Sequence, residues 1–333
     1  MRWRIFLPTL LVIIICIGWS IMWQVVSGRV DAGVEDWFAR ERLAGRTWAC
    51  AERTVSGFPF RIELHCRAPA FAGNVSGTSV TGGMGELLAA AHVYQPSLIV
   101  ATMTGPLKVT TGGQTSDLTW EVFRVSNRLK GAVLQQFALE LYKPVLTLAQ
   151  GTASPMVQRA DRVEVYARPT EDRPDNLEFA LRLIKVSAPA ADALSGNQDP
   201  FDLITRLVAT GTGLMEQAPL PQRLEAWRQA NGTLDIAEVK FAKADARIEA
   251  SGRFSLDEAH RPAGNLAIQS VGMEPILKRL GIPPAALAIG LALSGNAAQQ
   301  NAGPKPLNLS LKVESGRVSV GPMRTPLAVP PLY

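Results

Sequence analysis

The chain has 333 residues and a formal net charge of +5, and only 19% of its residues are charged. The charge is spread along the chain without a basic block, which argues against a nucleic-acid-binding protein. About 300 residues follow the apolar N-terminal segment, enough for one large β domain or two smaller ones.

The chain opens with a segment that predicts a membrane anchor. Arg2 and Arg4 precede 24 residues, Ile5 to Gly28, that carry no charge. As a helix they would measure roughly 36 Å, longer than the ~30 Å hydrocarbon core of a bilayer. Tryptophans occur near both ends, where interfacial aromatic belts form: Trp3, Trp19 and Trp23. By the positive-inside rule we expect a single-pass inner-membrane protein with a cytoplasmic N-terminus and a periplasmic body.

Two other interpretations of this segment stay open. Val26-Ser27-Gly28 resembles a small-residue cleavage site, so the segment could be a secretory signal, although its apolar run is longer than usual. A buried core helix is the third interpretation, and uninterrupted apolarity argues against it. A retained anchor and a cleaved signal both export the body.

Cysteine usage is consistent with export. Cys16 lies in the anchor, and the body contains only Cys50 and Cys66. A hairpin centred on Phe58 would place these two opposite each other, with Arg53 opposite Glu63. We expect a structural disulfide worth about 3 kcal/mol, with two unpaired buried thiols as the alternative. Two cysteines offer no metal-site spacing.

The pattern along the body is mostly that of strands. A short amphipathic helix is expected over Asp31–Leu43, and two more over Pro200–Ala209 and Pro221–Ala230, within a connection that begins at Ala188. Period-two alternation predicts strands near these segments: 60–66, His92–Thr104, Asp117–Val125, Ala132–Leu141, Asp161–Arg168 and Asn176–Ser187.

The last hundred residues show the clearest alternation. Apolar residues alternate with polar or small ones in three segments, near 248–256, 287–293 and 307–313. Long regular strands joined by short turns predict an antiparallel meander with one apolar face. Met273–Leu280 is expected to form a helix that caps this face.

The predicted fold class is therefore mainly β with a few helices (α+β). We expect an N-terminal transmembrane helix followed by long, curved antiparallel sheets with helices packed on one face. The predicted regions are 1–28, the anchor; 29–187, a β-rich region with the Cys50–Cys66 hairpin; 188–231, a helical connection; and 232–333, a second β-rich region.

Several local phrases carry a resemblance to a known family. They are Trp48–Cys50, Ser56–Ile62 with Cys66, Val93–Pro96, Ala250–Asp257, Arg261–Gly264 and Gly316–Pro322. Together these resemble an uncharacterised alphaproteobacterial envelope family, domain-of-unknown-function family 2125, which supplies no catalytic residues. The second half also resembles strand repeats of AsmA-like envelope proteins, and that likeness implies lipid handling between membranes.

No catalytic pattern emerges from the sequence. His65, His92 and His260 are scattered, and His65 alternates onto the polar face of its strand. We find no nucleophile elbow, His-Glu-x-x-His motif or P-loop, and we expect no enzyme activity, cofactor or metal. The apolar tip Phe58-Pro59-Phe60 either meets lipid or a partner, or packs on the body as an ordinary turn.

The preferred functional hypothesis is a non-enzymatic module that binds or passes lipid-like molecules along an apolar sheet face. The alternative is an envelope scaffold or assembly factor that contacts other envelope proteins, and a hydrolase is a third hypothesis. Ordinary core packing also explains the candidate groove residues, which are Ile248, Phe254, Leu256, Leu287, Ile289, Leu291 and Leu309.

Overall fold

The computed structural model describes residues 3–75, 77–131, 133–151, 153–211, 218–273, 276, 279, 307–320 and 323–333. Over these residues the chain is mainly β, as predicted, with three helices: α1 (Trp3–Leu43), α2 (Pro189–Ser195) and α3 (Leu220–Gln229). It divides into two compact units, Met1–Arg128 with Val145–Met156, and Leu129–Pro144 with Val157–Tyr333. The predicted region boundaries at residues 28, 187 and 231 stay predictions.

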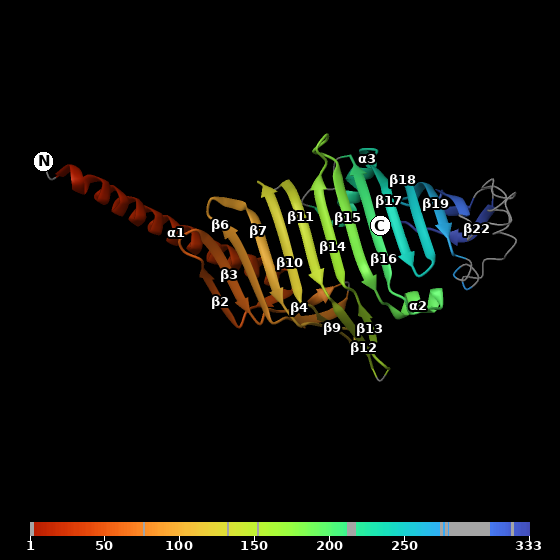
Figure 1. Ribbon diagram of the computed structural model, residues 1–333, viewed down its shortest axis with the longest axis horizontal. Coiled ribbons are helices and arrows are strands. Elements are labelled where there is room, and N and C mark those ends of the chain that lie inside the picture. The colour runs from red at the N-terminus through yellow and green to blue at the C-terminus, as the bar shows by residue number, and fades with distance from the viewer. Residues whose placement is uncertain are drawn as a thin grey trace. The chain divides into compact units, whose positions relative to one another are not determined.

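The first unit contains α1 and two antiparallel sheets (Figure 1). One sheet has the strand order β1-β4-β5-β8-β9-β12 and the other β2-β3-β6-β7-β10. Their bounds are β1 (Arg46–Ala49), β2 (Glu52–Ser56), β3 (Arg61–Arg67), β4 (Ala70–Val75), β5 (Thr78–Gly83), β6 (Glu86–His92), β7 (Gln95–Thr104), β8 (Leu107–Thr111), β9 (Gln114–Thr119), β10 (Val122–Lys130) and β12 (Val145–Gln150). The last two residues of β10 and most of β13 (Met156–Arg159) belong to the second unit.

The second unit is a meander of long strands in the order β11-β14-β15-β16-β17-β18-β19-β20-β21-β22. Every neighbouring pair in this order is antiparallel. The bounds are β11 (Val133–Tyr142), β14 (Arg162–Pro169), β15 (Leu177–Val186), β16 (Phe201–Thr210), β17 (Thr233–Lys243), β18 (Ala246–Leu256), β19 (Pro262–Val271), β20 (Leu307–Glu314), β21 (Arg317–Val320) and β22 (Met323–Ala328).

The helix α1 is longer than predicted. The expected amphipathic helix Asp31–Leu43 is the last part of α1 and is not a separate element. The helix α1 continues without a break to Leu43, and its later part packs against β1 and β2. From Phe6 to Gly18 the side chains are exposed, and the covered stripe begins at Trp19.

Two predicted elements are wrong. Pro200–Ala209 is not a helix, because Phe201–Thr210 forms β16, which pairs on both sides with β15 and β17. The expected strand Asp117–Val125 is two strands in different sheets, β9 and β10. The chain bends between them at Trp120, whose indole N–H donates to the Met103 carbonyl over 2.8 Å. The predicted helix Pro221–Ala230 is confirmed as α3.

The Cys50–Cys66 disulfide is confirmed, with 5.4 Å between the two Cα atoms. The predicted register of the hairpin is wrong: Arg53 lies opposite Cys66, and Ser56 lies opposite Glu63. The turn is closed by the Arg61 N–H donating to the Gly57 carbonyl, so its centre lies beyond Phe58.

The shift in register gives Arg53 different partners. Its guanidinium pairs with Asp31 at 2.9 Å and Glu35 at 2.7 Å, both on α1, and lies over the ring of Phe38. Arg53 therefore connects the hairpin to the helix instead of stabilising the hairpin internally.

The disulfide generates a first prediction. The bond closes a loop with a sequence separation of 16 residues, so the Cys50→Ala/Cys66→Ala variant should unfold with a free energy lower by about 3 kcal/mol. Denaturant unfolding of the full-length protein in detergent measures this change.

Cys16→Ala is the matched control, because Cys16 is an exposed free thiol on α1. It should leave the denaturation midpoint unchanged. Equal midpoints for the double variant and the native chain would show that the bridge does not stabilise the fold.

Candidate functional site

Four of the predicted groove residues lie together on one face of the second unit's sheet. Ile248, Phe254 and Leu256 alternate along β18 and share that face. Leu309 of β20 joins them, because it is paired with Ile268 of β19, which is paired with Ala250 of β18. All four side chains are half-buried. The other three, Leu287, Ile289 and Leu291, lie outside the described residues, as does most of Met273–Leu280.

This apolar face extends across neighbouring strands. Residues paired directly across an antiparallel sheet point to the same side, and the pairings join Leu203 to Phe241 and Phe241 to Ile248. Further half-buried apolar side chains continue the surface, namely Leu234, Ile236, Val239, Leu266, Ile268 and Leu311. We call this set, with the four predicted residues and with Leu203 and Phe241, the apolar face.

A bulge in β17 preserves the apolar face. Opposite β18 the register shifts between Ile236 and Val239, and opposite β16 Ala237 is the extra residue between Ile236 and Glu238. Side chains alternate between the two sides of a sheet along a strand. Without the extra residue, the apolar side chains of one half of β17 would therefore point to the opposite side. The bulge therefore keeps both Leu234 and Phe241 among apolar neighbours.

The opposite side of the same strands is charged. Along β18, Arg247, Glu249 and Arg253 are exposed. Arg253 pairs with Asp235 of β17, and on β17 itself Lys240 pairs with Glu238. The sheet thus has a charged side exposed to solvent and an apolar side that the described residues cover only partly.

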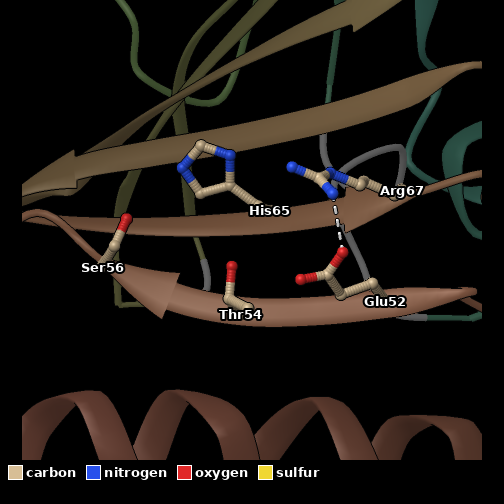
Figure 2. Close-up of a pocket in the computed structure, with 5 residues that line it drawn as sticks. All are labelled: Glu52, Thr54, Ser56, His65 and Arg67. Atoms are coloured by element: carbon tan, nitrogen blue, oxygen red, sulfur yellow. Dashed lines mark hydrogen bonds and ion pairs between the residues drawn. The ribbon is translucent and has the colours of Figure 1, made fainter.

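A polar hollow of about 220 Å³ lies on β2 and β3 in the first unit. Figure 2 shows its lining side chains, Glu52, Thr54, Ser56, His65 and Arg67. Thr54 lies directly across the strands from His65, but the described residues show no hydrogen bond from His65 to Thr54 or Ser56. Its ring nitrogens lie near carboxylates, with Nε2 3.7 Å from Glu63 and Nδ1 3.5 Å from Glu86. This arrangement lacks the contact between a base and a nucleophile that hydroxyl activation requires.

The polar groups in the described parts of the chain point to no particular reaction. In those parts, no cluster of three or more His, Cys, Asp or Glu side chains could hold a metal ion. The expectation that the protein is not an enzyme and takes no cofactor stays a prediction.

Sequence reasoning missed a buried amine in the second unit. Lys243, at the end of β17, is only 2% exposed. Its Nζ donates to Asp192 Oδ1 over 2.8 Å and also to the Asp199 carbonyl. The alternation along β17 could have indicated this burial. Lys243 lies two residues after Phe241 and four after Val239, so its side chain points to the apolar side of the strand. These two hydrogen bonds attach α2 and the loop after it to the sheet.

The C-terminus is docked on the second unit. The Tyr333 ring stacks on His260 at 4.4 Å between centroids, and its hydroxyl donates to Glu225 Oε2 over 2.9 Å. Hydrogen bonds from Arg228, then from Gln229 and Tyr333, lower the pKa of Glu225 to about 2. The carboxylate is therefore ionised at neutral pH and holds the last residue against α3.

The buried lysine generates a second prediction. Asp192→Ala leaves the Lys243 ammonium buried without its carboxylate, which should lower the free energy of unfolding by about 3–5 kcal/mol. Lys243→Met should cost less, because Asp192 keeps access to water. Denaturant unfolding of full-length variants gives the ranking.

Lys240→Met is the matched control, since it makes the same substitution on the same strand at an exposed position. It should change stability little. If Lys243→Met proves as costly as Asp192→Ala or costlier, the pair is not the element that attaches α2.

A protein-family model matches most of the chain. The family model described as "Uncharacterized protein conserved in bacteria (DUF2125)" matches residues 23–328. No curated protein matches the chain. The likeness to AsmA-like proteins stays a prediction. The match begins at Trp23 within α1 and includes residues of both units. The docked part of the helix from Trp23 onward, the Cys50–Cys66 hairpin and the apolar face fall inside it. The chain therefore belongs to this uncharacterised bacterial family.

Proposed function

We propose that this protein is held in the inner membrane by α1, with its body in the periplasm, and that the apolar face binds or passes lipid-like molecules. The observation that carries the proposal is the apolar face itself. It continues across at least five strands, β16 to β20, and its side chains are only half-buried by the described residues.

Several features support membrane attachment. By length and composition, α1 is long and apolar enough to cross a bilayer. Its side chains from Phe6 to Ile17 contact little else in the protein, and large apolar residues there are about half exposed, such as Ile13 at 49% and Leu10 at 55%. In water such a surface would be strongly unfavourable, whereas in hydrocarbon it is favourable. The disulfide suits an oxidising compartment such as the periplasm.

The docking of α1 favours a retained anchor over a cleaved signal. Cleavage near Gly28 would remove Trp19 and Trp23, whose indole N–H groups donate to the carbonyls of Pro59 and Arg61, each over 2.8 Å. It would also remove the buried Ser27. A signal peptide that leaves the protein does not need such contacts with the mature fold.

A lipid-like ligand fits the chemistry of the apolar face. The face is long and lacks a convergent set of polar groups, so it favours an extended apolar chain over a small polar molecule. The charged side of the sheet keeps the same strands soluble. Acyl chains would complete the burial of side chains such as Leu266 and Ile268, which are half-buried by the described residues.

The third prediction places a photoreactive amino acid at Ile268 of the full-length protein in its native membrane. Ile268 lies on the apolar face, and we expect ultraviolet cross-linking there to yield adducts with the mass of membrane lipids. Mass spectrometry of the purified protein identifies them.

The control is the same amino acid at Gln269, the next residue on β19, which points to the opposite side and is exposed. It should give several-fold fewer lipid adducts. Adducts to a protein at Ile268 would favour a scaffold or assembly factor over lipid binding, and equal yields at the two positions would remove the support for a lipid face.

A further inference from the structure

The tip of the β2–β3 hairpin is attached to α1 inside the predicted membrane-spanning segment. Trp19 and Trp23 donate their indole N–H groups to the Pro59 and Arg61 carbonyls. The same indoles contact the two phenylalanines of the tip: Trp19 lies 6.2 Å from Phe60, and Trp23 lies edge-on to Phe58 at 5.6 Å. The height of the tip along α1 is therefore determined by these four aromatic residues.

Large aromatic side chains remain exposed at this end of the unit. Phe58 is 56% and Phe60 60% exposed although both also contact tryptophan. The turn between β6 and β7 lies beside them, since the Val93 N–H donates to the Phe60 carbonyl over 3.0 Å. That turn carries Tyr94, which is 71% exposed. We call Trp19, Phe58, Phe60 and Tyr94 the aromatic patch.

The length of α1 determines how deep this patch lies if the helix spans a bilayer. A hydrocarbon core of about 30 Å requires about 20 residues at 1.5 Å per residue. Counted from Ile5, the first residue after Arg4, the core would extend to about Val25, and any tilt would extend it further. Trp19 and Trp23 would then lie roughly 9 Å and 3 Å below the outer boundary. The tip bonded to them must lie at or below that boundary as well.

The kinds of side chain that join α1 to the strands differ along the helix, and the difference fits this depth. At Trp19 and Trp23 the contacts are aromatic. Beyond the boundary ion pairs appear as well: Arg53 pairs with Asp31 and Glu35, and Arg46 pairs with Glu41 at 2.5 Å. They lie beside a further aromatic contact, between Trp37 of α1 and Trp48 of β1. Ion pairs of this kind are stable in water and costly in hydrocarbon, so the two ends of the docked helix suit different surroundings.

The polar group nearest the tip is of a kind that suits a lipid headgroup. The side chain of Arg61 is 60% exposed, with Nη1 at 3.4 Å from Glu63 Oε1, and its backbone carbonyl accepts a hydrogen bond from Trp23. A long arginine side chain at this level can extend its guanidinium to lipid phosphates while its methylenes stay in apolar surroundings. Tyrosine and tryptophan are also enriched at this level of a bilayer.

We propose that the aromatic patch inserts into the outer leaflet of the same bilayer that α1 crosses, with Arg61 at the headgroup level. This inference rests on the membrane attachment proposed above and adds a second contact with the bilayer. One helix alone can rotate and tilt. A helix with a hairpin inserted beside it holds the first unit at one depth and in one orientation on the membrane surface.

The test measures depth with single spin labels on the full-length chain in vesicles of phosphatidylethanolamine and phosphatidylglycerol. The background is Cys16→Ala, which leaves only the disulfide-bonded cysteines. Labels are placed one at a time at Phe58→Cys, Phe60→Cys and Tyr94→Cys. Ile13→Cys reports on the anchor, and Leu43→Cys, at a position that is 90% exposed on the same helix, is the aqueous control.

Collisions with oxygen and with a water-soluble nickel chelate give the depth of each label. We expect Ile13 to be deep, Leu43 to be aqueous, and the patch labels to lie within about 10 Å of the headgroup boundary on its lipid side. If Ile13 is deep and the patch labels behave as Leu43 does, the insertion is overturned while the anchor stands. If Ile13 itself is aqueous, the membrane attachment in the proposed function fails and the insertion fails with it.

A second measurement uses the native side chains, in case a label disturbs the turn. Hydroxyl-radical oxidation of the unmodified protein in lipid nanodiscs is compared, residue by residue, with oxidation of the unfolded chain. Phe58, Phe60 and Tyr94 should be protected and Leu43 should not. Their exposed fractions in the protein alone leave the patch open to solvent, so oxidation of the patch to the extent seen at Leu43 would contradict the insertion.

Discussion

The attachment of α1 to the hairpin tip is the interaction on which the account of this protein depends. Two indole N–H groups donate to the carbonyls of Pro59 and Arg61 on a turn whose own hydrogen bonding leaves those oxygens available. Because a buried or lipid-facing carbonyl without a donor is costly, each bond satisfies a group that the turn cannot satisfy internally. The attachment joins the apolar part of α1 to the fold, while ion pairs of Arg53 and Arg46 join its later part.

Beyond the hairpin tip, α1 continues along the strands and its acidic residues pair with arginines of the strands. Past Trp23, α1 continues to Leu43 along β2 and β1, and Arg53 and Arg46 pair with its acidic residues. From Phe6 to Gly18 its side chains are exposed. One continuous helix thus combines a segment suited to hydrocarbon with a segment suited to water. The second unit also separates apolar from charged side chains, because its sheet has one apolar and one charged side.

Local patterns in the sequence were sufficient for some of this structure. Uninterrupted apolarity between Ile5 and Gly28 identified the helix, and the strict alternation of β18 identified both its strand and its faces. The pairing of Cys50 with Cys66 followed from the absence of any other cysteine in the body. The candidate residues Ile248, Phe254 and Leu256 share a face because the alternation of side chains along one strand is a local property, whereas Leu309 joins them only through the pairing of β18, β19 and β20.

Features that depend on distant residues could not be predicted in this way. In β16, Phe201, Ile204 and Leu207 fit a helical period while Phe201, Leu203 and Leu207 fit a strand, and only pairing with β15 and β17 decides between them. The hairpin register depended on which residue closes the turn, and a small shift moved Arg53 from Glu63 to the acidic residues of α1. The burial of Lys243 required Asp192, 51 residues earlier in the chain.

The central claim is that the apolar face binds lipid, and the most direct test is the amount of lipid that co-purifies with the full-length protein. The native chain is compared with Leu266→Asn, which places a polar group at a half-buried position of that face, and both keep the same anchor. Mass spectrometry of extracted lipid should show less lipid per chain for the variant, while the Cys50–Cys66 bridge stays formed. Equal amounts of lipid per chain in the two proteins would mean that all of the lipid is bound by α1. That result would contradict a lipid-binding role for the sheet.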